Sequence, residues 1–414
     1  MLSQVRRQVA VLMATVAAFS LGLSGLVTSS ASAAGTTQGV TSKSVTLGLL
    51  VNLTGSLASS FSGTAMGAQA RIDEQNAKGG VDGRKIKLVI GDDQSLPTDS
   101  LSVTQSLVQE KHAFAVMEET AFFALDYKYL EQAGIPGIAG QPYDGGPEWP
   151  SKSTTDLVDA AGSQSVTSGN YGWLIKMLKT EHCTKLATVA NGASAAGVQY
   201  ANEIKQEAEA AGIQDVDEDN SLGFTQTDLT PNATTMKNSG ANCWVGITAA
   251  FAEEALLTAL QQQGANVKGV LLGNYSASFL QPPVNSDDQG MVTSFWYKTP
   301  EIDPSAANQI GAAERKYTGY TGTTPLTTGS YFGWIAADAA ITGLEAAGKN
   351  LTATSFLNGL HKTKAYTAGG LQAPVNLAVS KQGTYATSTA GSCMYALKVV
   401  GTKYVPVTKK PFCS

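Results

Sequence analysis

The sequence has little charge and few of the residues that most often act in catalysis. Only 15% of its 414 residues are charged, and it contains three histidines. Each histidine falls near the end of a predicted helix, and none follows a predicted strand: His112, His182 and His361. Phosphate-binding glycine loops are absent, and residues 192–197, GASAAG, lack the spacing of a nucleophile elbow. We therefore expect no catalytic residues, no cofactor and no enzymatic activity.

Basic residues are also scarce. The chain has 28 Lys and Arg residues against 33 Asp and Glu residues, which gives a formal net charge of −5 at pH 7. Binding to nucleic acid depends on Lys and Arg contacts to phosphates. The composition therefore disfavours nucleic acid as a partner.

Cysteine is limited to four residues, and no CxxC pair supports metal binding: Cys183, Cys243, Cys393 and Cys413. An even number of cysteines in an exported chain indicates two disulfides. Asp92 and Asp93 with Asp99 offer another set of metal ligands, but a capped helix start explains these residues more simply.

Long apolar runs are confined to the N-terminus. Arg6 and Arg7 precede the apolar residues 9–27, and Ala31-Ser32-Ala33 has the small residues of a cleavage site. We interpret residues 1–33 as a signal peptide, with a retained membrane anchor as the alternative. No later segment has 18 consecutive apolar residues, the length that would indicate a further span.

Residues 45–95 carry the clearest structural pattern. Residues 45–51, VTLGLLV, have the length and composition of a buried strand. A helix is predicted next, with apolar residues at i, i+3 and i+7 in residues 65–72 and a glycine stop at residues 79–80. Residues 85–90 are predicted to form a second strand. Together these elements form a βαβ unit, and open α/β sheets bind ligands at the carboxyl edge of the strands.

The same stretch carries a family resemblance. Its motifs are LTG at 53–55, DEQNAKGG at 73–80, GRK at 83–85 and DDQS at 92–95. In order and spacing they resemble the amino end of extracytoplasmic solute-binding proteins of the branched-chain amino acid type. The resemblance extends from about residue 45 to about residue 400. It implies a periplasmic-binding-protein type I fold: two similar doubly wound parallel-sheet α/β lobes joined by three hinge crossings.

The rest of the chain repeats this α/β pattern. We assign residues 45–158 and 298–372 to lobe 1, and residues 159–297 and 373–414 to lobe 2. The crossings are predicted at residues 156–165, near residues 293–300, and within residues 369–391. Strands predicted at residues 393–400 and 404–407 form a terminal hairpin.

Binding residues are expected in the loops after strands, where the lobes meet. The candidates in lobe 1 are Ser60, Phe61, Glu118, Glu119, Thr120, Gln141 and Tyr143. The candidates in lobe 2 are Asn191, Phe251, Asn274, Tyr275 and, at the hinge, Trp296. The alternatives are that Glu118 and Glu119 form a solvated loop pair, and that Phe251 and Tyr275 are core aromatics.

The resemblance assigns roles to some of these residues. Thr120 and Tyr143 stand where the family has hydroxyl groups that hold a ligand carboxylate. Tyr275 stands where the family has an acid that faces the ligand ammonium, and Ala196 where it has an aromatic residue. Because a buried ammonium without an anionic partner is costly, either Glu118 or Glu119 supplies the charge or the ligand lacks an ammonium.

Sheets of this type also suggest the disulfide pairing. Cys183 and Cys243 each stand at the entry of a strand, and the fold places those two strands side by side. Cys393 and Cys413 lie on opposite arms of the terminal hairpin. We predict bonds Cys183–Cys243 and Cys393–Cys413.

The resemblance implies an exported, monomeric protein that binds a small-molecule ligand and delivers it to the membrane permease of an ABC transporter. The leader lacks the lipid-modified cysteine that many family members carry, so we expect a secreted or cell-envelope-associated chain. A sensor subunit of the same fold is the first alternative, and a secreted hydrolase is the second. The substitutions at Tyr275 and Ala196 favour an aromatic or bulky acid or amide over leucine, isoleucine and valine.

Overall fold

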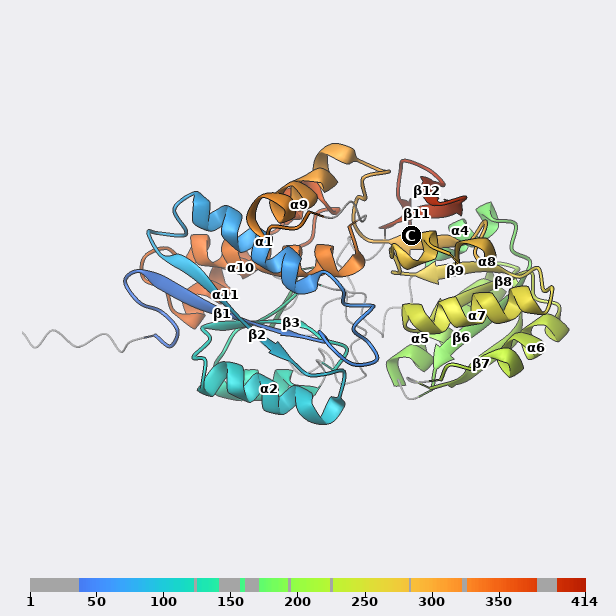
Figure 1. Cartoon of the computed structure of the whole chain (residues 1–414), viewed down its shortest axis with the longest axis horizontal. Coiled ribbons are helices and arrows are strands. Elements are labelled where there is room, and N and C mark those ends of the chain that lie inside the picture. The colour runs from blue at the N-terminus through green and yellow to red at the C-terminus, as the bar shows by residue number, and fades with distance from the viewer. Residues whose placement is uncertain are drawn as a thin grey trace, which may run out of the picture. The chain divides into compact units, whose positions relative to one another are not determined.

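The computed structural model describes residues 37–122, 125–140, 157–160, 171–192, 195–223, 226–282, 284–321, 326–377 and 393–414. The predicted signal peptide lies outside these residues. Within them the strands form two sheets, which we call the first and the second sheet (Figure 1). No helix in the described ranges is both long enough and apolar enough to span a membrane.

The first sheet has five parallel strands in the order β2-β1-β3-β4-β5. The strands are β1 (Ser44–Val51), β2 (Lys85–Asp92), β3 (Ala115–Glu119), β4 (Gly137–Ala139) and β5 (Leu157–Asp159). The strand β1, which lies between β2 and β3, is almost wholly buried, as its apolar sequence predicts. The strand β5 corrects our expectation that residues 156–165 only cross to the second lobe, because residues 157–159 still pair with β4.

The second sheet contains a parallel part and an antiparallel end. The parallel strands, in the order β10-β9-β8-β6-β7, are β6 (Lys185–Asn191), β7 (Gln214–Leu222), β8 (Cys243–Ile247), β9 (Lys268–Leu272) and β10 (Val292–Phe295). The antiparallel strands are β11 (Cys393–Val400), β12 (Lys403–Pro406) and β13 (Phe412–Cys413). Because β10 is part of this sheet, the crossing predicted near residues 293–300 begins after Phe295.

Helices cover both sheets (Figure 1). Those associated with the first sheet are α1 (Thr64–Ala77), α2 (Pro97–Gln109), α3 (Tyr127–Ala133), α9 (Pro304–Tyr317), α10 (Thr328–Ala347) and α11 (Ala353–Lys362). Those associated with the second are α4 (Gly172–Thr180), α5 (Ala195–Ala210), α6 (Thr230–Ser239), α7 (Ala250–Gln262) and α8 (Val284–Asp287). Two short 3₁₀ helices are η2 (Ser278–Leu280) and η3 (Ala368–Gly370).

The helix α10 returns from the second sheet to pack on α1 and on β3 and β4 of the first. Glycine makes this packing close. A Cβ atom on Gly67 of α1 would collide with the Ser330 backbone, and one on Gly333 of α10 would collide with the Thr64 backbone. The chain therefore crosses between the sheets after β5, after β10 and again before β11, which confirms the expected fold class.

Both predicted disulfides are present. Cys183 lies two residues before β6 and Cys243 opens β8, and the two strands are neighbours in the sheet. Cys393 bonds to Cys413, but Cys413 lies on β13 and not on the second arm of the β11–β12 hairpin. The pairing was right, although the geometric reason for the second bond was incomplete.

Two further local predictions need correction. Asp99 does not cap α2, because the cap residue is Leu96 and Pro97 begins the helix. The strand β7 was not predicted, since its residues include Asp215, Asp217, Glu218 and Asp219. It is an edge strand, and its mostly half-buried side chains explain why its pattern is polar.

Candidate functional site

A buried polar network joins the carboxyl ends of β1, β2 and β3. Asn52 Nδ2 donates to Asp93 Oδ1 at 2.5 Å, and the Thr120 hydroxyl donates to Asp93 Oδ2. The Asn52 side-chain oxygen accepts from the backbone N–H of Ala121 at 2.9 Å. Asn52, Asp93 and Thr120 are fully buried. Thr120 therefore lies at the expected edge, but its hydroxyl proton is already directed to Asp93.

Glu118 and Glu119 are the last two residues of β3 and are fully buried. The alternative of a solvated loop pair is therefore wrong. Burial raises the pKa of Glu118 well above its usual range, and the negative charges of Asp126, Glu119 and Asp93 add to the shift. Glu119 Oε1 accepts a hydrogen bond from the backbone N–H of Gly140 at 2.5 Å, which ties β3 to the end of β4.

Asp126, which the sequence analysis missed, belongs to the same region. It is fully buried, it accepts a hydrogen bond from the Ser100 hydroxyl, and burial raises its pKa to about 7. Burial likewise raises the pKa of Asp93, against the lowering effect of its hydrogen bonds. The first sheet thus contains several buried carboxyl groups whose pKa is raised.

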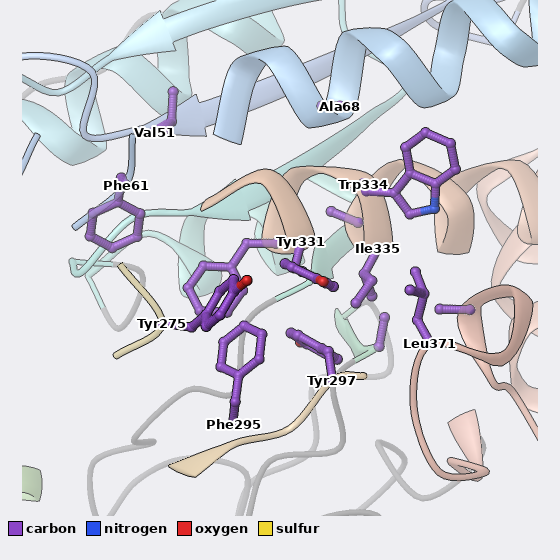
Figure 2. Packing of buried hydrophobic residues seen from close by; sticks show 14 of the residues in the cluster. Val51, Phe61, Ala68, Tyr275, Phe295, Tyr297, Tyr331, Trp334, Ile335 and Leu371 are labelled. Atoms are coloured by element: carbon purple, nitrogen blue, oxygen red, sulfur yellow. The ribbon is translucent and has the colours of Figure 1, made fainter. Parts of the chain in front are cut away.

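The other candidates of lobe 1 differ in their surroundings. Phe61 is 8% exposed and packs in the core near Val51 (Figure 2). Ser60 has a buried hydroxyl for which no hydrogen-bond partner is found within the described ranges. Gln141 and Tyr143 lie outside the described residues, so their roles stay predictions.

The carboxyl edge of the second sheet holds the remaining candidates. Asn191 is the last residue of β6 and is 7% exposed. Phe251 is the second residue of α7, is partly buried and packs at the border of the core. Asn274 is half-buried and follows β9. The side chain of Ala196, in α5, is not among those described.

Trp296 follows β10 and is partly buried. Its ring lies where a Cβ atom on Gly273 would be, and Gly273 has a left-handed φ of 79°. Glycine is therefore required at that turn for two reasons, because a side chain would be strained and would also collide with the indole.

Tyr275 lies in an aromatic cluster and is 1% exposed. Its ring centroid is 5.4 Å from Phe295, 5.0 Å from Tyr404 and 6.3 Å from Tyr331. Figure 2 shows the rings of Tyr275, Phe295, Tyr297 and Tyr331 packed against one another. The structure thus places Tyr275 in the core, as the alternative interpretation held.

The backbone of Tyr275 connects the second sheet to α10. Its N–H donates to Thr328 Oγ1 at 3.0 Å, and its carbonyl accepts from the Thr328 N–H at 3.0 Å and from the Thr328 hydroxyl at 2.8 Å. Its phenol donates to Glu301 at 3.2 Å. The segment after β9 is consequently fixed to a helix that packs on the first sheet.

Glu253 is a carboxyl group that the sequence analysis missed. It lies in the first turn of α7, is 1% exposed, and accepts a hydrogen bond from Asn274 Nδ2. Burial raises the pKa of Glu253 well above its usual range, and the charge of Glu254 adds to this. The signal that could have indicated it is its position at the start of the helix that follows β8.

No group of three or more His, Cys, Asp or Glu side chains in the described ranges is arranged to hold a metal ion. Asp92 instead accepts hydrogen bonds from the backbone N–H groups of Leu53 at 3.0 Å and Thr54 at 3.2 Å. Asp92 and Asp93 therefore hold loops in place.

Two sheets built mainly of parallel strands, with helices on their faces and polar residues at their carboxyl ends, define a class of two-lobed α/β binding folds. The profile of a family described as "Periplasmic binding protein" matches residues 44–403. The chain belongs to this periplasmic binding protein family, with the type I arrangement.

Known proteins agree with this assignment. The Leu/Ile/Val-binding protein BraC3 of Rhizobium johnstonii is 27% identical over 176 residues, which span 42% of this chain and 46% of that protein. The chain thus matches just under half the length of this relative.

Two solved structures share the fold. A fatty acid ABC transporter substrate-binding protein from Thermomonospora curvata has a TM-score of 0.75 at 19% identity, covering 91% of this chain and 94% of that one. A solute-binding protein of an ABC transporter from R. palustris, in complex with 4-hydroxybenzoate, has a TM-score of 0.75 at 17% identity, covering 90% and 98%.

Proposed function

We propose that this chain is an exported substrate-binding protein that captures one small ligand between two lobes and delivers it to the permease of an ABC importer. The lobes are residues 45–158 with 298–372, and residues 159–297 with 373–414. The observation that carries the proposal is the set of polar side chains at the carboxyl ends of both sheets, in a chain of this family.

The ligand we propose is a small carboxylate or amide, aromatic or bulky, and not a branched-chain amino acid. Tyr275 stands where the family has an acid, and it lies in the core with its phenol directed to Glu301. Burial raises the pKa of Glu118 well above its usual range, which makes this residue a poor anionic partner for a ligand ammonium. The binding of 4-hydroxybenzoate by a protein of the same fold supports an aromatic acid as a ligand.

The test is a thermal-shift screen of the purified exported protein against amino acids, amides, hydroxy acids, aromatic acids and fatty acids. A ligand that binds only the native state raises the unfolding midpoint in a concentration-dependent way. At a ligand concentration 100 times Kd, the free energy of unfolding increases by about 2.7 kcal/mol. Compounds that raise the unfolding midpoint should share a carboxylate or amide group. A screen in which no class shifts the midpoint, with a folded and monomeric protein, would contradict the proposed function.

A further inference from the structure

A hydrogen bond orients the Asn274 side chain, because it uses the amide nitrogen of that side chain as a donor. Asn274 Nδ2 donates to Oε2 of Glu253, which is nearly fully buried under the start of α7. A Cβ atom on Gly246 of β8 would lie 2.7 Å from Glu253 Oε1, so glycine at that position leaves room for the carboxyl group. The pair thus links the ends of β8 and β9 through α7.

The Glu253 carboxyl group favours its neutral form. Burial raises the pKa of Glu253 well above the usual range and the like charge of Glu254 adds to this, against the lowering effect of hydrogen bonds from Asn274 and the Thr248 backbone. Glu253 Oε2 accepts a hydrogen bond from Asn274 Nδ2. The side chain thus offers Asn274 an acceptor in a place where burial disfavours a negative charge.

The backbone around Asn274 is also fixed. Its carbonyl accepts a hydrogen bond from the Thr293 hydroxyl at 2.7 Å, and Gly273 N–H donates to Ser294 O at 3.0 Å. The next residue, Tyr275, is paired with Thr328. Asn274 itself is half-buried, and within the described ranges no group donates to its Oδ1.

We propose that Glu253 is a positioning residue: it holds the amide nitrogen of Asn274 and leaves Asn274 Oδ1 free to accept a hydrogen bond from the ligand. The ligand therefore carries a neutral hydrogen-bond donor, a hydroxyl or an amide N–H, at the end held by the second sheet. An amide oxygen pairs well with such a donor, whereas a buried ammonium requires an anionic partner. This inference rests on the proposed function and narrows its ligand class.

The experiment uses matched compounds that differ in the donor, with calorimetry on the full exported protein. The first pair is 4-hydroxybenzoate and 4-fluorobenzoate, and the second is 2-hydroxy-4-methylpentanoate and 4-methyl-2-oxopentanoate. In at least one pair, the compound with the donor should have a Kd lower by a factor of about ten or more than that of its partner. The reason is that a site built around a hydrogen bond rejects the analogue that lacks it. Equal affinities within every pair that binds would overturn the inference.

Four variants separate positioning from a general structural role. Asn274→Ala and Glu253→Met should lose the preference for the donor, while Glu253→Gln, which keeps an acceptor, should retain it. Glu254→Gln is the matched control, because Glu254 is the neighbouring carboxyl group and accepts from Ser278, not from Asn274. Loss of the preference in Glu254→Gln, or its survival in Asn274→Ala, would overturn the inference.

A second readout needs no ligand. The side-chain amide proton signals of Asn274 in an NMR correlation spectrum should shift in Glu253→Met and stay near their wild-type positions in Glu254→Gln. Unchanged signals in a folded Glu253→Met would overturn the positioning role.

The outcomes also separate this inference from the proposed function. If the wider screen finds a tight ligand without a hydroxyl or amide donor, the inference fails and the proposed function stands. If no compound in the screen or the pairs binds, both fail.

Discussion

The Thr120 hydroxyl connects ligand binding with stability, because it donates to a buried carboxyl group. Asp93 is fully buried and depends on Thr120, Asn52 and the Ser95 backbone for its hydrogen bonds. Removing one of these donors leaves a buried acceptor short of a partner. The family resemblance predicts a loss of ligand affinity in Thr120→Ala, and the structure adds a loss of stability.

We expect Thr120→Val to lower the free energy of unfolding by about 1–3 kcal/mol, because it removes the hydroxyl with little change in volume. Thr120→Ser should keep most of the stability. The measurement is urea denaturation, with Thr98→Ala as a control at an exposed threonine whose hydroxyl donates to Asp99. A Thr120→Val variant as stable as the wild type would show that Asp93 does not need this donor.

Several buried carboxyl groups make stability depend on pH. The folded-state pKa of Asp126 is about 7, and those of Asp93 and Glu118 are raised by burial. Carboxyl groups of an unfolded chain titrate near pH 4. The folded state therefore binds protons that the unfolded state releases, and stability decreases as pH rises from about 5 to about 8.

Asp126→Asn should reduce this decrease, because the asparagine does not lose a proton as pH rises. The comparison is the free energy of unfolding of wild type and variant at pH 5 and pH 8. The wild type should lose on the order of 1–3 kcal/mol over this interval, and the variant less. A wild type that becomes more stable toward pH 8 would show that these groups are ionised in the folded protein.

At the scale of elements, glycine in the α1–α10 contact provides a clear test. A Cβ atom on Gly333 would strike the backbone of Thr64, which a rotamer change cannot relieve. In α9, a Cβ atom on Gly311 would lie 3.3 Å from Arg315 Nη1, the end of a flexible side chain. The two glycines thus share a helical setting and differ in their neighbours.

Gly333→Ala should destabilise the protein by about 1–3 kcal/mol or more through overpacking. Gly311→Ala should be neutral or stabilise by up to about 1 kcal/mol, because alanine has the higher helix propensity. Thermal and urea unfolding of both variants make the comparison. Equal stability of the two variants would mean that α10 does not approach the Thr64 backbone of α1 closely at Gly333.

The disulfides can be compared through the loops they close. Cys183–Cys243 spans 60 residues and Cys393–Cys413 spans 20. The loop-entropy argument makes removal of the first costlier by about 1 kcal/mol. Denaturation of the two Cys→Ser double variants tests this prediction. If removal of Cys393–Cys413 lowered the free energy of unfolding more, native contacts of β11 and β13 would outweigh the loop-entropy effect.

Elements with strong apolar patterns were predictable from the sequence, and those with mixed patterns were not. The buried strand β1 was predicted to within one residue. The strand β7 was missed because an acidic edge strand has no apolar alternation. Glu118 and Glu119 were taken for loop residues because charged side chains seldom end a fully buried strand.

The site was predictable only as far as the resemblance and the strand ends indicate. Thr120 lies at its expected edge, but its bond to Asp93 depends on a residue 27 positions away. Glu253 could not be linked to Asn274 from the sequence, because the pairing depends on how α7 lies over β8 and β9. Long-range contacts of buried polar groups are set by packing and leave no periodic signal.

At the scale of the whole molecule, the strand order requires the chain to pass between the sheets three times. The aromatic cluster of Tyr275, Tyr297 and Tyr331 brings the segment after β10 against the first turns of α10. Tyr297 donates its phenol to the carbonyl of Gly140 at 2.6 Å, joining the segment after β10 to the end of β4. Ligand binding that favours one arrangement of the two sheets can shift the population of that arrangement.

Ligand selectivity is a property of both sheets together. We expect leucine, isoleucine and valine to bind weakly or not at all, because burial raises the pKa of Glu118 and of Glu253 and makes both of them poor anionic partners for an ammonium group. Calorimetry with each amino acid checks this, with the best ligand of the thermal-shift screen as the positive control. Micromolar or tighter binding of leucine would overturn the expectation.

The central claim is that one small ligand binds at the carboxyl ends of the two sheets. The most direct measurement is calorimetric titration of the exported protein and of Asn274→Ala with the best ligand from the screen. The account predicts one ligand per chain and an affinity about tenfold or more lower in the variant, which should remain folded. Binding of equal strength in Asn274→Ala, or a stoichiometry other than one, would contradict it.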